Sequence, residues 1–294
     1  MVIRRSGGVL AALLVALALG GCSSGVMDGL LGEDTSTRAA ATPGGALAPE
    51  LGADGEGQKV AALYNEGLVN LNSGSHKSAV KKFAEVERQY PYSVWATRSI
   101  LMQAYANYQS AKYDDAINAC NRFITLHPGH KDAPYAYYLI ALSDYDRIAD
   151  VKRDQSATLK ALAALEEVAR RFPDSPYARD AAKKAILAKD HLAGKEMEIG
   201  RYYLKQGSHL AGINRFKKVV TDYQTTSQTP EALYRLTEGY MALGVVSEAQ
   251  TAAAVLGQNY PNSEWYRDAY ALVGSGGETP VENKKSWISR AFGG

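Results

Sequence analysis

Small and apolar residues recur at helical spacing through residues 58–273, and each amphipathic stretch ends in the same kind of segment. These segments are QYPYS (89–93), LHPGH (126–130), RFPDS (171–175), DYQTT (222–226) and NYPNS (259–263). Four of the five place proline directly after an aromatic residue or histidine. Because proline cannot continue a helix and disfavours helical backbone before it, the pattern predicts five helices that end at these segments.

When the five segments are aligned on their third residue, three earlier positions also agree. Twelve residues before it stand Ala79, Ala116, Ala161, Gly212 and Ala249; eight before, Phe83, Cys120, Leu165, Phe216 and Ala253; five before, Val86, Phe123, Val168, Val219 and Leu256. The preceding helices match less uniformly, with Gly67, Ala104 and Gly200 at their small position but Thr237 in the last repeat. Small residues let helices approach closely, and apolar residues four and seven positions later continue one helical face, so pairs of packed helices are expected.

The aligned segments are 37, 45, 51 and 37 residues apart, near or above the 34-residue period of tetratricopeptide repeats, which the chain resembles. We therefore predict an all-α tetratricopeptide solenoid of about five helix pairs over residues 58–273, with sub-blocks of about 58–150 and 151–273. The longer spacings predict a charged loop at residues 146–156 and one long helix within 175–207. A nonrepetitive helical bundle is the alternative.

The two ends of the chain differ from this domain. Arg4 and Arg5 precede eleven apolar residues, 9–19, which as a helix reach about 16 Å, half of a bilayer core. Residues 1–21 therefore predict a signal peptide, and Leu19-Gly20-Gly21-Cys22 resembles a bacterial lipobox. A signal peptide with a chance cysteine is the alternative. Residues 22–57 predict a flexible tether, and 274–294 a Gly-rich tail whose SWISRAF stretch is either a contact or disordered.

By that resemblance, Cys22 is expected to carry a diacylglycerol group and an N-acyl chain. These acyl chains would suffice for stable anchoring. Ser23 after the cysteine favours the outer membrane, as in sorted lipoproteins. We expect a lipid-anchored protein that faces the periplasm and has no other cofactor.

Charge and reactive side chains exclude several classes of function. Removing residues 1–21 takes away two of the 33 basic side chains and none of the 31 acidic ones, which leaves a balanced chain and argues against nucleic acid. With Cys22 lipidated, Cys120 has no disulfide partner and is expected to be buried. Only His127 and His130 lie close together, around a Pro-Gly turn, too few ligands for a metal site. No catalytic motif is present, so we expect no enzyme, no catalytic residue and no metal.

Tyrosine is unusually frequent, with nineteen residues against five phenylalanines. On the predicted first helices of repeats one to three, apolar and tyrosine side chains fall at helical spacing. These are Tyr64, Leu68, Leu71, Leu101, Tyr105, Tyr108, Tyr135 and Tyr138. Half-exposed tyrosines would suit a groove that holds an extended peptide substrate. Ordinary packing between repeats is the alternative for each of them.

The lipobox together with the repeats resembles the BamD (ComL) family, lipoproteins of the machinery that assembles outer-membrane β-barrels. The resemblance covers about residues 58–272. Its most specific stretches are RQYPYS (88–93), RFI (122–124), YYL (202–204) and NRF (214–216).

The resemblance implies a non-enzymatic scaffold. Its C-terminal repeats would dock on periplasmic domains of the barrel-forming subunit, with Arg215, Asn214 and Arg201 as partner-binding residues. Its N-terminal repeats would receive unfolded outer-membrane proteins, and accessory lipoproteins would attach. For Arg215, pairing with a nearby acid on a solvated helix face is the alternative. For the whole chain, the alternative is a tetratricopeptide lipoprotein that scaffolds peptidoglycan synthesis or remodelling enzymes.

Overall fold

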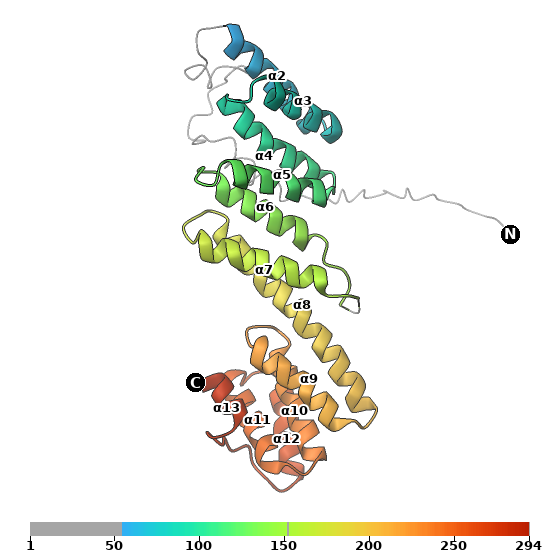
Figure 1. Ribbon diagram of the computed structural model, residues 1–294. Helices are drawn as coiled ribbons and strands as arrows, with labels where there is room; N and C mark the ends of the chain where they lie inside the picture. Colours follow the sequence, from blue (N-terminus) through green and yellow to red (C-terminus); the bar gives the residue numbers. More distant parts are fainter. Residues whose placement is uncertain (1–54, 152, 294) are drawn as a thin grey trace, which may run out of the picture. The chain divides into compact units, whose positions relative to one another are not determined.

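The computed structural model describes residues 55–151 and 153–293, and within these ranges it is all-α, without a strand. Helices alternate with short turns and pack mainly against their neighbours in the chain (Figure 1). The helices are α2 (Gly55–Asn72), α3 (His76–Gln89), α4 (Val94–Gln109), α5 (Tyr113–Leu126), α6 (Ala133–Tyr145), α7 (Ser156–Arg171), α8 (Ala178–Lys205), α9 (His209–Asp222), α10 (Thr229–Ala242), α11 (Val246–Asn259), α12 (Glu264–Ser275) and α13 (Trp287–Gly293). The predicted all-α repeat fold is confirmed, with five helix pairs from α2/α3 to α10/α11.

The aligned positions form the core of each helix pair. All fifteen lie on the second helices, α3, α5, α7, α9 and α11, and all are buried. A three-position pattern read from the sequence therefore identifies the face by which each second helix packs, because residues four and seven apart share one side of a helix.

Two glycines on first helices are required by large rings on second helices. A Cβ atom on Gly200 would lie 2.4 Å from Cε1 of Phe216, and one on Gly67 would lie 2.6 Å from Cε1 of Phe83. Both rings are fully buried. The small residue of the first helix and the aromatic residue of the second helix therefore pack directly against each other, in repeat one and again in repeat four.

The second helices end with one common geometry. Their C-cap residues are Tyr90, His127, Phe172, Tyr223 and Tyr260, with φ between −130° and −136°. The same geometry appears in α9, where Gln224 replaces the proline, so the proline is not essential for it. Instead, the Gln224 side-chain amide donates a hydrogen bond to the carbonyl oxygen of Ala291 in α13. The residue that replaces the proline in repeat four, Gln224, therefore contacts the C-terminal helix instead.

The predicted long helix is α8, with 28 residues. It packs against α7 on one side and α9 on the other. Lys189 binds Glu166 of α7 at 2.7 Å, and further along the helix Glu196 binds residues of α9. One continuous helix can pack against both α7 and α9 because its 28 residues span about 42 Å.

The C-terminal segment contacts the last repeats, so the SWISRAF stretch is a contact. Ile288 is fully buried, and α13 packs against α11 and α9. Trp287 donates its indole N–H to the Tyr240 hydroxyl at 3.2 Å, and the Ser286 hydroxyl donates to Glu248 at 2.6 Å. In Figure 1, α13 lies beside α9 and α11.

Several predictions fall outside the described residues. These are the signal peptide, the lipidated Cys22 and the tether as far as residue 54. The last three residues that we assigned to the tether, 55–57, instead begin α2.

Candidate partner-binding site in the C-terminal repeats

Arg215 lies in an ion-pair network between α8 and α9. Its Nη1 is 3.1 Å from Oε2 of Glu196, and Nζ of Lys218 is 2.7 Å from Oε1 of the same carboxylate. The Glu196 side chain is 10% exposed, whereas those of Arg215 and Lys218 are 40% and 46% exposed. We call these three residues the Glu196 network. Pairing with a nearby acid is therefore what the structure shows for Arg215, while much of its side chain still faces solvent.

The two cations determine the protonation of Glu196. Partial burial by itself would raise the pKa of this carboxyl, but hydrogen bonds from Lys218 and Arg215 outweigh it and hold the pKa below its ordinary value. The carboxylate is thus ionised near neutral pH and orients both cations on the α9 surface.

Because the pKa of Glu196 is lowered in the folded protein, the free energy of unfolding depends on pH. The contribution of Glu196 is fully present above its ordinary pKa of 4.5 and is lost as the pH falls through the lower folded-state pKa. We expect Glu196→Gln to weaken the fall in unfolding free energy on acidification below pH 4.5. Urea unfolding at several pH values measures this, and parallel profiles for the two proteins would contradict it.

Arg201 belongs to a second network, between α8 and α10. Its Nη1 is 2.8 Å from Oε2 of Glu231, and its Nη2 is 2.7 Å from Glu198. Glu231 also binds Nε of Arg235 at 3.3 Å, so one carboxylate, 14% exposed, lies between two guanidinium groups. Arg235 further binds Glu238 at 2.8 Å.

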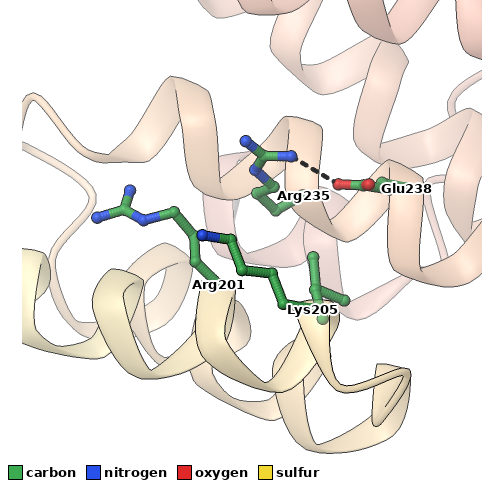
Figure 2. Close-up of a pocket in the computed structure, with 5 residues that line it drawn as sticks. Arg201, Lys205, Arg235 and Glu238 are labelled. Carbon is green, nitrogen blue, oxygen red and sulfur yellow. Dashed lines mark hydrogen bonds and ion pairs between the residues drawn. The ribbon is translucent and has the colours of Figure 1, made fainter.

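A pocket of about 180 Å³ opens beside this second network and is lined by Arg201, Leu204, Lys205, Arg235 and Glu238. Figure 2 shows that its polar side chains come from two helices, with Arg201 and Lys205 on α8 and Arg235 and Glu238 on α10. We call it the Lys205 pocket.

Asn214 is placed differently again, on the exposed face of α9. It lines an open pocket of about 520 Å³ with the α8–α9 turn and the end of α10. Two leucines of this pocket are strongly exposed, Leu210 at 65% and Leu243 at 45%. We call it the Asn214 pocket. An exposed apolar patch beside a polar side chain is typical of a surface that contacts another protein.

The three predicted partner-binding residues thus lie in three different settings. Arg215 and Asn214 are neighbours on α9, whereas Arg201 points to α10 and contacts neither the Glu196 network nor the Asn214 pocket in any recorded contact. The structure therefore associates Arg215 with Asn214 and separates Arg201 from both.

The predicted substrate groove needs a larger correction. Six of its eight residues are buried, with side chains 1–6% exposed: Tyr64, Leu71, Leu101, Tyr105, Tyr135 and Tyr138. Only Leu68 and Tyr108 are partly accessible. The first helices are covered on several sides, since α4 packs against α2, α3, α5 and α6. The expectation of half-exposed tyrosines was wrong for these positions, which pack between repeats.

The tyrosine hydroxyls also contribute to packing between repeats. Tyr108 donates to Asp146 at 2.6 Å, beyond the end of α6, and Tyr138 of α6 donates to Asp180 of α8. In contrast, the hydroxyl of Tyr135 has no hydrogen-bond partner in the described structure. Tyrosine thus supplies apolar area for the interior and a polar tip that links successive first helices.

Sequence reasoning missed the residues that complete these sites: Glu196, Lys218, Lys205, Arg235 and Leu243. Part of the signal was available, because Lys205 follows Arg201 by four residues and Arg235 follows Glu231 by four, so each pair shares a helix face. Which faces meet across α8, α9 and α10 could not be read from spacing within one helix.

Reactive groups play no visible part in these sites. Among residues 55–151 and 153–293, no group of three or more His, Cys, Asp or Glu side chains could hold a metal ion. Burial raises the pKa of the Cys120 thiol well above its ordinary value, so the thiol stays protonated and unreactive. No helix in the described part of the chain is long and apolar enough to cross a membrane.

Stacked helix pairs with cationic and apolar pockets on their surface define a helical-repeat protein of the all-α class. More particularly, the chain belongs to the YfiO family, described as outer membrane lipoproteins, whose model matches residues 56–256.

Relatives of known name agree with this family. The chain is 50% identical over 236 residues to the outer membrane protein assembly factor BamD of Caulobacter vibrioides, covering 80% of this chain and 77% of that one. It is 48% identical over 214 residues to BamD of Rickettsia prowazekii, covering 73% and 85%. BamD of Neisseria meningitidis serogroup A is 36% identical over 221 residues, covering 72% and 83%. These names describe assembly factors rather than catalysts, in agreement with a non-enzymatic scaffold.

Proposed function

We propose that this protein is a scaffold of outer-membrane β-barrel assembly, anchored in the outer membrane through lipid on Cys22. The observation that carries the proposal is the 50% identity, over most of the chain, to a protein named as an outer membrane protein assembly factor. The described residues contribute surfaces for binding and no candidate for catalysis. A scaffold needs none, because holding two partners side by side raises the local concentration of one at the other.

In this proposal the C-terminal repeats dock on periplasmic domains of the barrel-forming subunit through Arg215 and Asn214. Arg215 suits that role because Glu196 orients its guanidinium while leaving it 40% exposed, and a guanidinium can bind a carboxylate with two parallel hydrogen bonds. Leu210 and Leu243 of the neighbouring Asn214 pocket add apolar area that a partner would cover. Unfolded barrel proteins would bind the N-terminal repeats, and accessory lipoproteins would attach elsewhere.

Charge reversal at Arg215 tests the docking surface. We expect Arg215→Glu to weaken binding of the barrel-forming subunit at least about tenfold and to lower outer-membrane barrel levels, because a carboxylate replaces the donor that the partner's acid would meet. Co-purification of the lipidated protein from detergent-extracted membranes, followed by mass spectrometry, measures this.

Lys218→Glu is the matched control, since Lys218 binds the same Glu196 carboxylate and is similarly exposed. If the two variants lost the partner equally, loss of the Glu196 network would explain the result and the specific role of Arg215 would be wrong. Peptidoglycan synthases or hydrolases in place of a large barrel protein would overturn the proposed function and leave the fold unchanged.

A further inference from the structure

We propose that the Lys205 pocket binds a carboxylate carried by an extended peptide segment. The pocket is lined by three cationic side chains and one carboxylate, and both of its arginines are paired with acids, which leaves the Lys205 ammonium as the lining cation without an ion pair among the described residues. Its volume of about 180 Å³ suits one acidic side chain or one chain-terminal residue rather than a folded element. The inference does not depend on which protein docks at Arg215.

The two arginines of the pocket are held in place before any ligand arrives. Glu231, 14% exposed, binds Nη1 of Arg201 and Nε of Arg235. The Arg235 guanidinium also lies over the Tyr234 ring at 5.1 Å and the Trp265 ring at 5.6 Å. These contacts fix the orientation of the cations, which reduces the conformational entropy that binding would cost.

Lys205 is the cation that remains available. It occupies the last position of α8, is exposed, and forms no ion pair with any residue that the structure describes. Figure 2 shows its side chain extending along α8 toward Arg201. Leu204 also lines the pocket. A carboxylate in the pocket would therefore meet a free ammonium group flanked by two oriented guanidinium groups.

The acids beside the pocket limit where the carboxylate of a ligand can bind. Glu238 binds Nη1 of Arg235 at 2.8 Å and would repel a second carboxylate placed on that side. Glu198 binds Nη2 of Arg201 at 2.7 Å and would repel it in the same way, so the carboxylate of the ligand is expected at the Lys205 ammonium. Leu204 in the lining favours a peptide with apolar residues beside its acid.

A carboxylate on a peptide has two sources, an Asp or Glu side chain and the chain terminus. Three probes distinguish them, each with an uncharged fluorophore: acetyl-Ala-Leu-Glu-Leu-Ala-amide, its Gln counterpart as the amide, and the Gln counterpart with a free terminal carboxylate. Fluorescence anisotropy with the full-length lipidated protein in neutral detergent measures their affinities. Preference for the first probe identifies a side chain as the ligand, and preference for the third identifies the terminus.

Lys205→Ala is expected to weaken binding of the preferred acidic probe about two- to fivefold, the upper part of the range for an ion pair that water can reach. Lys183→Ala is the matched control, because Lys183 is also an exposed lysine on α8 but lies outside the pocket. Equal binding of all three probes, no binding of any probe, or equal effects of the two substitutions would overturn the proposal.

This outcome can be separated from the docking experiment. A Lys205→Ala protein that loses the acidic probe yet retains the barrel-forming subunit supports a peptide site distinct from the Arg215 surface. Failure of the Arg215→Glu experiment, in turn, leaves the probe measurements and their interpretation unchanged.

Discussion

Replacing Phe216 by alanine is expected to lower the free energy of unfolding by about 3–5 kcal/mol, the usual range for truncating a buried aromatic side chain. The ring is fully buried and occupies the space that Gly200 leaves on the facing helix. Removing it leaves a cavity between α8 and α9, where the long helix joins repeat four. Guanidinium unfolding of the protein expressed without residues 1–22, followed by far-UV circular dichroism, measures the change.

The facing glycine supplies a sharper test of the same contact. In the natural protein Gly200→Ala is expected to destabilise by about 1–3 kcal/mol, because its Cβ would lie 2.4 Å from the Phe216 ring. In the Phe216→Ala background that clash is gone, and alanine should stabilise the helix by up to about 1 kcal/mol relative to glycine. A Gly200→Ala effect of the same sign and size in both backgrounds would refute the proposed contact. Gly67 and Phe83 offer an independent copy of the arrangement in repeat one.

Ile288→Asp is expected to detach α13 from the last repeats. Ile288 is fully buried, and a carboxylate there would lie in an apolar environment without a partner. Burial of an isoleucine is worth about 1.5–3 kcal/mol, so amide hydrogens of residues 286–293 should exchange at least about tenfold faster. Hydrogen exchange read by mass spectrometry on peptides from this segment measures the effect.

Val281→Asp is the control for this experiment, because Val281 lies in the same C-terminal segment but is 57% exposed. It should leave the exchange of residues 286–293 unchanged. If both substitutions accelerated exchange equally, the segment would depend on its overall charge rather than on the buried isoleucine, and the anchoring role of Ile288 would be wrong.

The three predicted partner-binding residues show that closeness along the chain does not place residues in one setting. Arg201, Asn214 and Arg215 are close in sequence, but the turn between α8 and α9 reverses the chain between the first and the other two. Arg215 consequently pairs with Glu196 of α8, and Arg201 pairs with Glu231 of α10. The acids that bind these arginines from the other side of a helix–helix contact lie 19 and 30 residues away in sequence.

The tyrosines show a different limit of sequence reasoning. Their helical spacing correctly identified one face of α2, α4 and α6, but spacing does not reveal whether that face meets solvent or another helix. A tyrosine suits both environments, since its ring is apolar and its hydroxyl polar. In the fold these tyrosines are buried, because each first helix has neighbours on more than one side, as α4 does.

The sequence by itself determined the all-α repeat architecture, the ends of the second helices and the residues of each helix-pair core. These features depend on interactions within about forty residues, such as the Gly67–Phe83 contact. They also recur, so a pattern found in one repeat supports the same prediction in the others. Only the tertiary structure decided that the tyrosines are buried, that the C-terminal segment covers part of the last repeats, and that Lys205 and Arg235 share a pocket. Those features arise where faces of different repeats meet, and no local periodicity records which faces these are.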